Sequence, residues 1–288
     1  MEKKIKFQIT SEQDGLMIKA ILSKHLNLSR REISRLKFNH GIVVNGESVR
    51  VTEIMHEGDT VEIIFLEQDE KKAQIIENKP EILYEDEDLV IVNKPTGMPT
   101  HPSHKHLHDD MGTLLQNYYQ KKFVVRAIGR LDKDVSGVVL YAKNQPSASR
   151  LSTQRNTGIL QKTYIAIIHG KVKKKKDTLV YGIHKQENSI LKSVNPNEKD
   201  CITHYEVLKE NDDYTILKVI IETGKSHQIR AGLAYFLQPI VGDALYGKKE
   251  DIPCCLHCAS ITLQQPFQKE RIVVEAPLPT YMQKFYTK

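Results

Sequence analysis

Residues 129–144, GRLDKDVSGVVLYAKN, join a polar loop to an apolar run in the middle of the chain. An Arg-Leu-Asp triplet and a second acid come first, the small pair Ser136-Gly137 follows, and the run Val-Val-Leu-Tyr occupies residues 138–141. Such a run, rich in β-branched residues and bounded by Gly and Asn, predicts a buried strand. Arg130 and Asp132 should therefore lie on the loop that enters this strand, where rigid structure can hold functional side chains.

The triplet places a carboxylate and a guanidinium two residues apart. Asp132 suits a nucleophile or a general acid or base, and Arg130 suits contact with a phosphate or a nucleobase. One alternative is an ordinary turn, in which the Asp caps the backbone and the Arg covers a surface. Another pairs Asp132 with Asp134 for glycosidase or nucleosidase chemistry, but side chains two apart on an extended loop should point in opposite directions.

The stretch resembles the signature of the RluA-type RNA pseudouridine synthases, in which Arg-Leu-Asp precedes small residues and an apolar strand. The resemblance implies that Asp132 is the catalytic residue and that Arg130 helps to displace the target uridine. This sequence departs from the family pattern at Gly129, where the family usually has His, and at Val135, where it usually has Thr. The family fold is α+β, with a mixed, mostly antiparallel sheet flanked by helices, and we expect the same here.

Further family motifs occur along the chain in the family's order: KPTG (94–97), KTY (162–164), TGKSHQIRAGLA (223–234), PIVGDALYG (239–247) and LHCASITL (256–263). By resemblance, Tyr164 packs against the target base and Arg230 forms an ion pair with Asp132. The residue types alone allow blander interpretations, namely a core tyrosine and a structural arginine at a helix start. Lys94 either pairs with a core acid or lines the cleft.

The first 75 residues predict a compact unit of two helices and a hairpin. Apolar spacing indicates a helix over 16–26, and a Ser29/Glu32 capping box starts a second helix that ends near Asn39, with Gly41 in the left-handed conformation. A turn through Asn45-Gly46 and a strand over 60–65 follow. This order resembles the αL-type RNA-binding module that a small-subunit ribosomal protein shares with several RNA enzymes. The alternatives for its basic helix face are a solvated surface and a set of phosphate contacts made by Arg30, Arg31, Arg35 and Lys37.

The charged segment EQDEKKAQIIENKP (67–80) separates this unit from the rest of the chain. We expect an RNA-binding domain over residues 1–75, a linker over 76–80 and a catalytic domain over 81–288. In the second domain the patterns predict strands over 82–84, 89–93, 162–168 and 215–222, and helices over 113–122 and 147–154.

Composition restricts the remaining possibilities. The 288 residues carry a formal net charge of +6, which permits an acidic partner. No apolar stretch is long enough to span a bilayer, so a cytoplasmic location is expected. The four cysteines and the histidines at 101, 104, 106 and 108 follow no complete zinc pattern, which favours free thiols and no metal site.

Taken together, the sequence predicts an enzyme that isomerises uridines in structured RNA, with large-subunit ribosomal RNA as the expected substrate. The reaction calls for no cofactor, and we expect a monomer without a membrane partner. The alternative is a catalytically inactive RNA-binding or ribosome-assembly factor that uses the same fold for binding alone.

Overall fold

The computed structural model describes residues 2–26, 28, 30–38, 40–66, 79–102, 109–186 and 189–287. Its internal contacts divide the chain into two units, Met1–Ile75 and Ile76–Lys288. Each unit has its own buried apolar core, and each is described separately below.

The first unit is a four-stranded antiparallel sheet with two α-helices, α1 (Ile18–Lys24) and α2 (Arg30–Phe38). The strands lie in the order β1-β4-β2-β3, with bounds β1 Glu2–Gln8, β2 Ile42–Val44, β3 Glu47–Ser48 and β4 Thr60–Leu66. The expected hairpin turn is confirmed, because Asn45 and Gly46 both have positive φ angles, 51° and 90°.

The end of α2 differs from the expectation. His40, not Gly41, takes the left-handed conformation, with φ 52°. Gly41 is required for a different reason, because a Cβ there would lie 2.5 Å from the Ile64 carbonyl oxygen of β4. The capping box cannot be assessed, since Ser29 lies outside the described residues.

The second unit is built on one eleven-stranded sheet, which is mixed and mostly antiparallel as expected. The strand order is β11-β10-β12-β13-β9-β14-β8-β6-β5, with β15 paired to β14 and β7 to β8. The bounds are β5 Ile82–Glu85, β6 Leu89–Lys94, β7 Arg126–Ala127, β8 Ser136–Ala142, β9 Gln161–His169, β10 Lys176–Lys185, β11 Lys192–Asn195, β12 Cys201–Glu210, β13 Tyr214–Ile221, β14 Leu256–Gln264 and β15 Arg271–Glu275.

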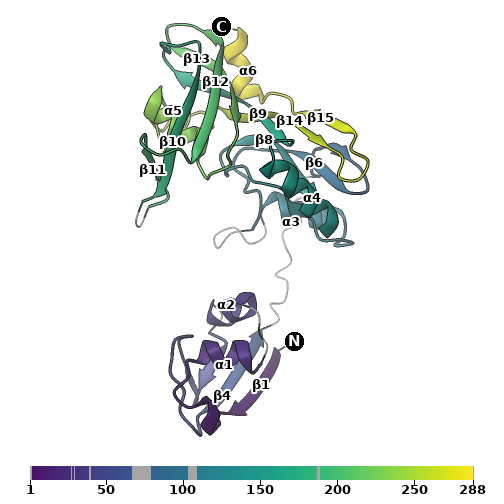
Figure 1. Ribbon diagram of the computed structural model, residues 1–288, viewed down its shortest axis with the longest axis vertical. Helices are drawn as coiled ribbons and strands as arrows, with labels where there is room; N and C mark the ends of the chain where they lie inside the picture. The colour runs from purple at the N-terminus through teal and green to yellow at the C-terminus, as the bar shows by residue number, and fades with distance from the viewer. Residues whose placement is uncertain are drawn as a thin grey trace. The chain divides into compact units, whose positions relative to one another are not determined.

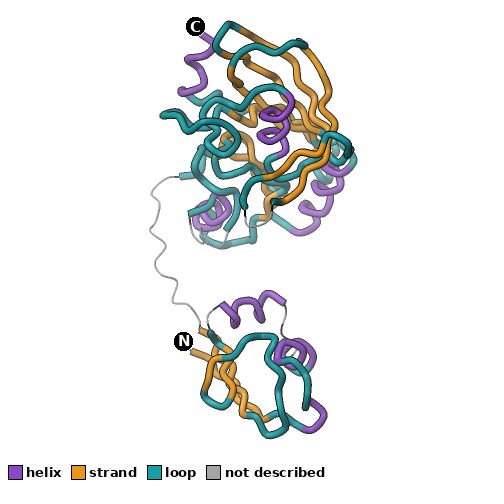
Figure 2. The backbone as a smooth tube through the Cα atoms, turned by 90° about the vertical axis from the view of Figure 1, so that its left-hand side faces the viewer, coloured by secondary structure: helices purple, strands orange, loops and turns teal. Residues whose placement is uncertain are grey.

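Four helices accompany this sheet in the described part of the second unit: α3 Met111–Tyr118, α4 Gln145–Asn156, α5 Gln228–Phe236 and α6 Thr280–Thr287. Figure 1 shows α5 beside β10 at one end of the sheet, and α3 and α4 near β6 and β8 at the other. Figure 2 shows these helices around the periphery of the strands. No helix in the described ranges is long and apolar enough to cross a membrane.

The predicted strands and helices of this unit are present, with one notable shift. The helix expected over 113–122 begins at Met111, because the Asp110 side chain accepts a hydrogen bond from the Thr113 backbone N–H, and it ends at Tyr118. Gln120 and Lys121 then take positive φ angles of 52° and 57°, which no helix accommodates.

The strand that follows the RLD loop, β8, is buried along its whole length. Gly137 pairs with Cys258 in the parallel β8/β14 contact, and a Cβ on Gly137 would overlap the Cys258 carbonyl oxygen. Its φ of 107° is also one that other residues rarely adopt. The small residue after the acidic loop thus allows β14 to lie directly beside β8.

His257 on β14 gives this contact a pH dependence. The side chain is fully buried, its Nδ1 lies 2.9 Å from the Ser136 hydroxyl, and burial lowers its pKa from 6.5 to about 4. Below pH 6.5 the unfolded chain binds a proton that the folded chain excludes, so the free energy of unfolding should fall by on the order of 3 kcal/mol as pH drops to 4. Urea unfolding of His257→Gln between pH 4 and 6.5 should show a smaller pH slope, whereas the same change at exposed His101 should leave the slope unaltered.

Candidate active site

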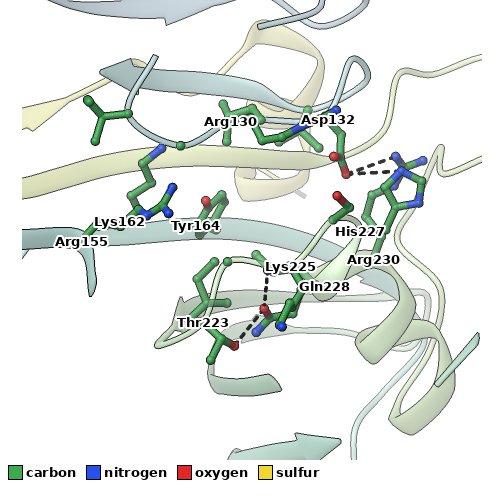
Figure 3. Close-up of a pocket in the computed structure, with 18 of the residues that line it drawn as sticks. Arg130, Asp132, Arg155, Lys162, Tyr164, Thr223, Lys225, His227, Gln228 and Arg230 are labelled. Atoms are coloured by element: carbon green, nitrogen blue, oxygen red, sulfur yellow. Dashed lines mark hydrogen bonds and ion pairs between the residues drawn. The ribbon is translucent and has the colours of Figure 1, made fainter. Parts of the chain in front are cut away.

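A cavity of about 930 Å³ in the second unit collects side chains from three segments. They are the loop before β8, the start of β9, and the turn that joins β13 to α5 (Figure 3). Three of the four residues predicted for the catalytic site, Asp132, Tyr164 and Arg230, line this cavity together with Arg130. The fold thus brings together side chains that are up to 100 residues apart in the sequence.

The loop that carries Asp132 is fixed by hydrogen bonds to its backbone. The buried Thr100 hydroxyl donates to the Leu131 carbonyl at 2.8 Å and accepts from the Leu131 N–H at 3.0 Å. The Val135 N–H donates to the Asp132 carbonyl at 3.1 Å and closes a tight turn. Backbone satisfied in this way holds the carboxylate in one place.

Lys94 adds a third support, in a role that neither sequence interpretation anticipated. Its side chain is fully buried below the loop, and its Nζ donates to the carbonyls of Pro95, Met98 and Lys133 at 2.8, 2.7 and 3.2 Å. Burial lowers its pKa to about 7, while the charges of Asp132 and Asp134 act in the opposite direction.

Arg230 faces Asp132, but its strongest partner is a different acid. The Arg230 Nη1 lies 3.6 Å from Asp132 Oδ2, whereas Nε and Nη2 donate to the two carboxylate oxygens of the fully buried Asp243 at 2.8 and 2.6 Å. Although burial opposes the charge, the bidentate bond to Asp243 raises the pKa of Arg230. The expected Asp132–Arg230 pairing is therefore present as a looser contact beside a buried Arg–Asp ion pair.

Asp134 corrects a second expectation. We expected the side chains of Asp132 and Asp134 to point in opposite directions, yet both carboxylates approach Arg230, at 3.6 and 3.5 Å. The alternation assumed an extended backbone, and the turn at Asp132–Val135 breaks it. Asp132 lines the cavity, whereas the half-exposed Asp134 does not.

His227 is a site residue to which the sequence assigned no role. It has φ 61° at the start of α5, and its Nε2 lies 4.0 Å from Asp132 Oδ2. Its Nδ1 lies 2.9 Å from the Tyr246 hydroxyl, which already accepts the Lys192 N–H. The Tyr246 O–H is thus placed to donate to Nδ1, which puts the ring proton on Nε2, facing Asp132. Burial lowers the pKa of His227 and favours this neutral form.

Tyr164 lies on β9 with its ring at the cavity wall and only 5% of the residue exposed. Burial raises its pKa well above 10, and the nearby negative charge of Asp132 acts in the same direction. The phenol therefore remains protonated. Its neighbours on the wall include Arg155 and Lys162, two cations to which the sequence assigned no site role.

The turn between β13 and α5 is organised by Gln228, a buried amide. Its Oε1 accepts from the Thr223 hydroxyl at 3.0 Å and the Lys225 N–H at 3.1 Å, and its Nε2 donates to the Ile202 carbonyl and the Thr203 hydroxyl. All four bonding positions of the amide are used, so the turn that leads to His227 is rigid.

The proposed RNA contacts of the first unit are less fully described. Lys37 is exposed on α2. The side chains of Arg30, Arg31 and Arg35 lie outside the described residues, as do His104, His106 and His108. Within the described ranges no group of three or more His, Cys, Asp or Glu residues is placed to hold a metal ion, and all four cysteines are buried free thiols, as the sequence favoured.

Comparison with known proteins places the chain in a family. The model of the RNA pseudouridylate synthase family matches residues 88–235, and the RluD ribosomal pseudouridine synthase N-terminal domain matches residues 5–61. The chain is 33% identical to the uncharacterized RNA pseudouridine synthase YjbO of Bacillus subtilis, over 90% of this chain and 94% of that protein. It is 28% identical to ribosomal large subunit pseudouridine synthase D of Vibrio cholerae, over 91% of this chain and 87% of that one.

Solved structures agree on the fold. Human RNA Pseudouridylate Synthase Domain Containing 1 superposes with a TM-score of 0.58 at 20% sequence identity, covering 69% of this chain and 83% of that one. The family match spans the RLD loop, Tyr164 and Arg230, the residues that meet at the cavity. The chain belongs to the RNA pseudouridylate synthase family.

Proposed function

We propose that this protein converts specific uridines of large-subunit ribosomal RNA to pseudouridine, with Asp132 as the catalytic carboxylate. The observation that carries the proposal is the position of the Asp132 carboxylate on the cavity wall, 3.6 Å from the Arg230 guanidinium and in the same cavity as Tyr164. Similarity to proteins named ribosomal large subunit pseudouridine synthase D supports the choice of RNA.

The target uridine must first leave its stack, because a carboxylate cannot reach the bond between sugar and base inside a helix. In this proposal Arg230, whose charge is balanced by Asp243, orients the Asp132 carboxylate toward the cavity. Two routes are open to Asp132, attack on the anomeric carbon of the sugar or removal of a proton from the sugar. Either route breaks the bond to uracil N1, after which the base rotates, rejoins through C5 and loses the C5 proton. The product is an isomer, so the overall reaction balances without an oxidant, reductant or energy donor.

The remaining predicted residues fit around this reaction. The Tyr164 ring packs against the flipped base, and its protonated hydroxyl can hydrogen-bond without adding negative charge. Arg130 is exposed at the cavity and helps to displace the uridine. The RNA-binding domain of residues 1–75 contacts phosphates through Arg30, Arg31, Arg35 and Lys37. The protein acts as a cytoplasmic monomer without a cofactor.

Mapping pseudouridines in ribosomal and transfer RNA from cells with and without this protein tests the proposal. We expect a small set of large-subunit positions to lose the modification, and to regain it with the wild-type gene but not with Asp132→Asn. Loss confined to transfer RNA would refute the ribosomal substrate. Unchanged RNA, together with retained RNA binding, would favour the non-catalytic binding factor.

A further inference from the structure

Two cations lie together on the cavity wall, away from Asp132. Arg155 projects from the last turn of α4 and Lys162 from the start of β9. The position that a Cβ would take on Gly129 is 3.6 Å from Arg155 Nη1 and 4.0 Å from Lys162 Nζ. Figure 3 shows the two charged ends close together on one side of Tyr164, with Asp132, His227 and Arg230 on the other.

Neither cation is neutralised by the protein. In the part of the chain that the structure describes, neither forms a hydrogen bond or an ion pair. The two acids that line the cavity are engaged elsewhere, Asp132 with Arg230 and Glu222 with His204, the latter at 2.7 Å. The nearby Cys258 thiol does not compensate, because burial raises its pKa to about 11 and keeps it neutral.

Such an arrangement is unfavourable unless an anion occupies the space in front of it. Burial lowers the pKa of Lys162, and the neighbouring Arg155 charge lowers it further. A partly buried cation next to a second one is stabilised only by a negative charge from outside the protein. Gly129, where the family usually has His, has no side chain to cover the two charged ends.

We propose that Arg155 and Lys162 form a subsite for a phosphodiester of the bound RNA, next to the extruded uridine and across Tyr164 from Asp132. This inference rests on the proposed function. A planar guanidinium beside a compact ammonium is a favourable combination for phosphate oxygens, because one offers paired donors and the other a point charge. Gly129 is three residues from Asp132, so the backbone separates the two parts of the site by at most roughly 11 Å. The subsite fixes the RNA backbone while Asp132 acts on the sugar.

The salt dependence of RNA affinity tests this subsite without knowledge of the target uridine. A single-stranded oligouridylate binds the full chain with a dissociation constant whose logarithm varies linearly with that of the salt concentration, by about 0.7 per phosphate contact. Lys162→Met and Arg155→Gln should each reduce that slope by about 0.7 and weaken binding at low salt by roughly tenfold. Lys185→Met removes the same charge from an exposed position outside the cavity and should change neither quantity.

A second measurement separates phosphate binding from a structural role. Because Lys162 carries an uncompensated charge in the free protein, Lys162→Met should leave the midpoint of thermal unfolding unchanged or raise it. A lowered midpoint with an unchanged salt slope would overturn the proposal, and so would an equal slope change in Lys185→Met. Tritium release from RNA labelled at uridine C5 is measured in parallel with the wild-type protein. If the slope changes as expected but no tritium is released, the phosphate subsite stands and the proposed catalytic function fails.

Discussion

Replacing Asp132 with Asn is expected to reduce pseudouridine formation by at least ~10³-fold, while RNA affinity stays within about threefold of the wild type. Asn has nearly the same size, so the loop held by Thr100 and Lys94 should keep its conformation. An amide, however, can neither attack the sugar nor remove a proton from it. Single-turnover tritium release from a large-subunit ribosomal RNA transcript measures the reaction, and filter binding of the same RNA measures affinity.

Asp134→Asn is the matched control for this prediction. It makes the same chemical change at a carboxylate that also lies 3.5 Å from Arg230, but 46% of that side chain is exposed and it does not line the cavity. We expect its activity to stay within about tenfold of the wild type, since exposed ion pairs contribute little. Equal losses in both variants would attribute the effect to the charge balance of Arg230. Release of free uracil by the wild type would indicate the nucleosidase alternative.

Asp243→Asn should lower the free energy of unfolding by about 3–5 kcal/mol. Asp243 is fully buried and binds Arg230 through both oxygens, at 2.8 and 2.6 Å, while Oδ1 also accepts the Leu245 N–H at 3.0 Å. Asn retains an oxygen for the backbone bond but leaves the guanidinium, which is only 2% exposed, without its bidentate counter-ion. Asp132 and Asp134 are more distant and cannot replace it. Urea unfolding monitored by circular dichroism gives the difference.

The double variant Arg230→Met/Asp243→Asn distinguishes the buried charge from a packing defect. With both charges removed, no ion is left unpaired in the core, and much of the stability lost in Asp243→Asn should return. Activity should not return, because no guanidinium then faces Asp132. A single variant as stable as the wild type would show that the Arg230–Asp243 pair contributes little to the fold.

Much of the fold could be predicted because strands and helices are encoded locally. The apolar runs at β6, β8, β9 and β13 each identify a strand from a few neighbouring residues. The pairing between distant strands has no such local signal. That β14 lies between β8 and β9 depends on Gly137 tolerating the Cys258 backbone, a contact between residues 121 positions apart.

The candidate site shows the same division. Asp132, Tyr164 and Arg230 were predicted from motifs, and they do line one cavity. Asp243 and His227 stand within motifs that were recognised, yet only coordinates show that one holds Arg230 and the other faces Asp132. Their shared signal was a charged or titratable residue within a family motif that no assigned role explained. Arg155 has no motif at all, since a basic residue in the last turn of an amphipathic helix usually serves the helix itself.

The insertion of β14 between β8 and β9 also bears on how the enzyme is made. During synthesis the RLD loop and Tyr164 leave the ribosome well before residues 256–264, so their two strands must wait for a partner encoded near the end of the chain. Pairing over such long sequence separations is slow, because the entropy of loop closure is lost before the contacts form. A nascent or prematurely terminated polypeptide therefore has its RNA-binding segment long before it has a working centre, and chemistry begins only once translation is nearly complete.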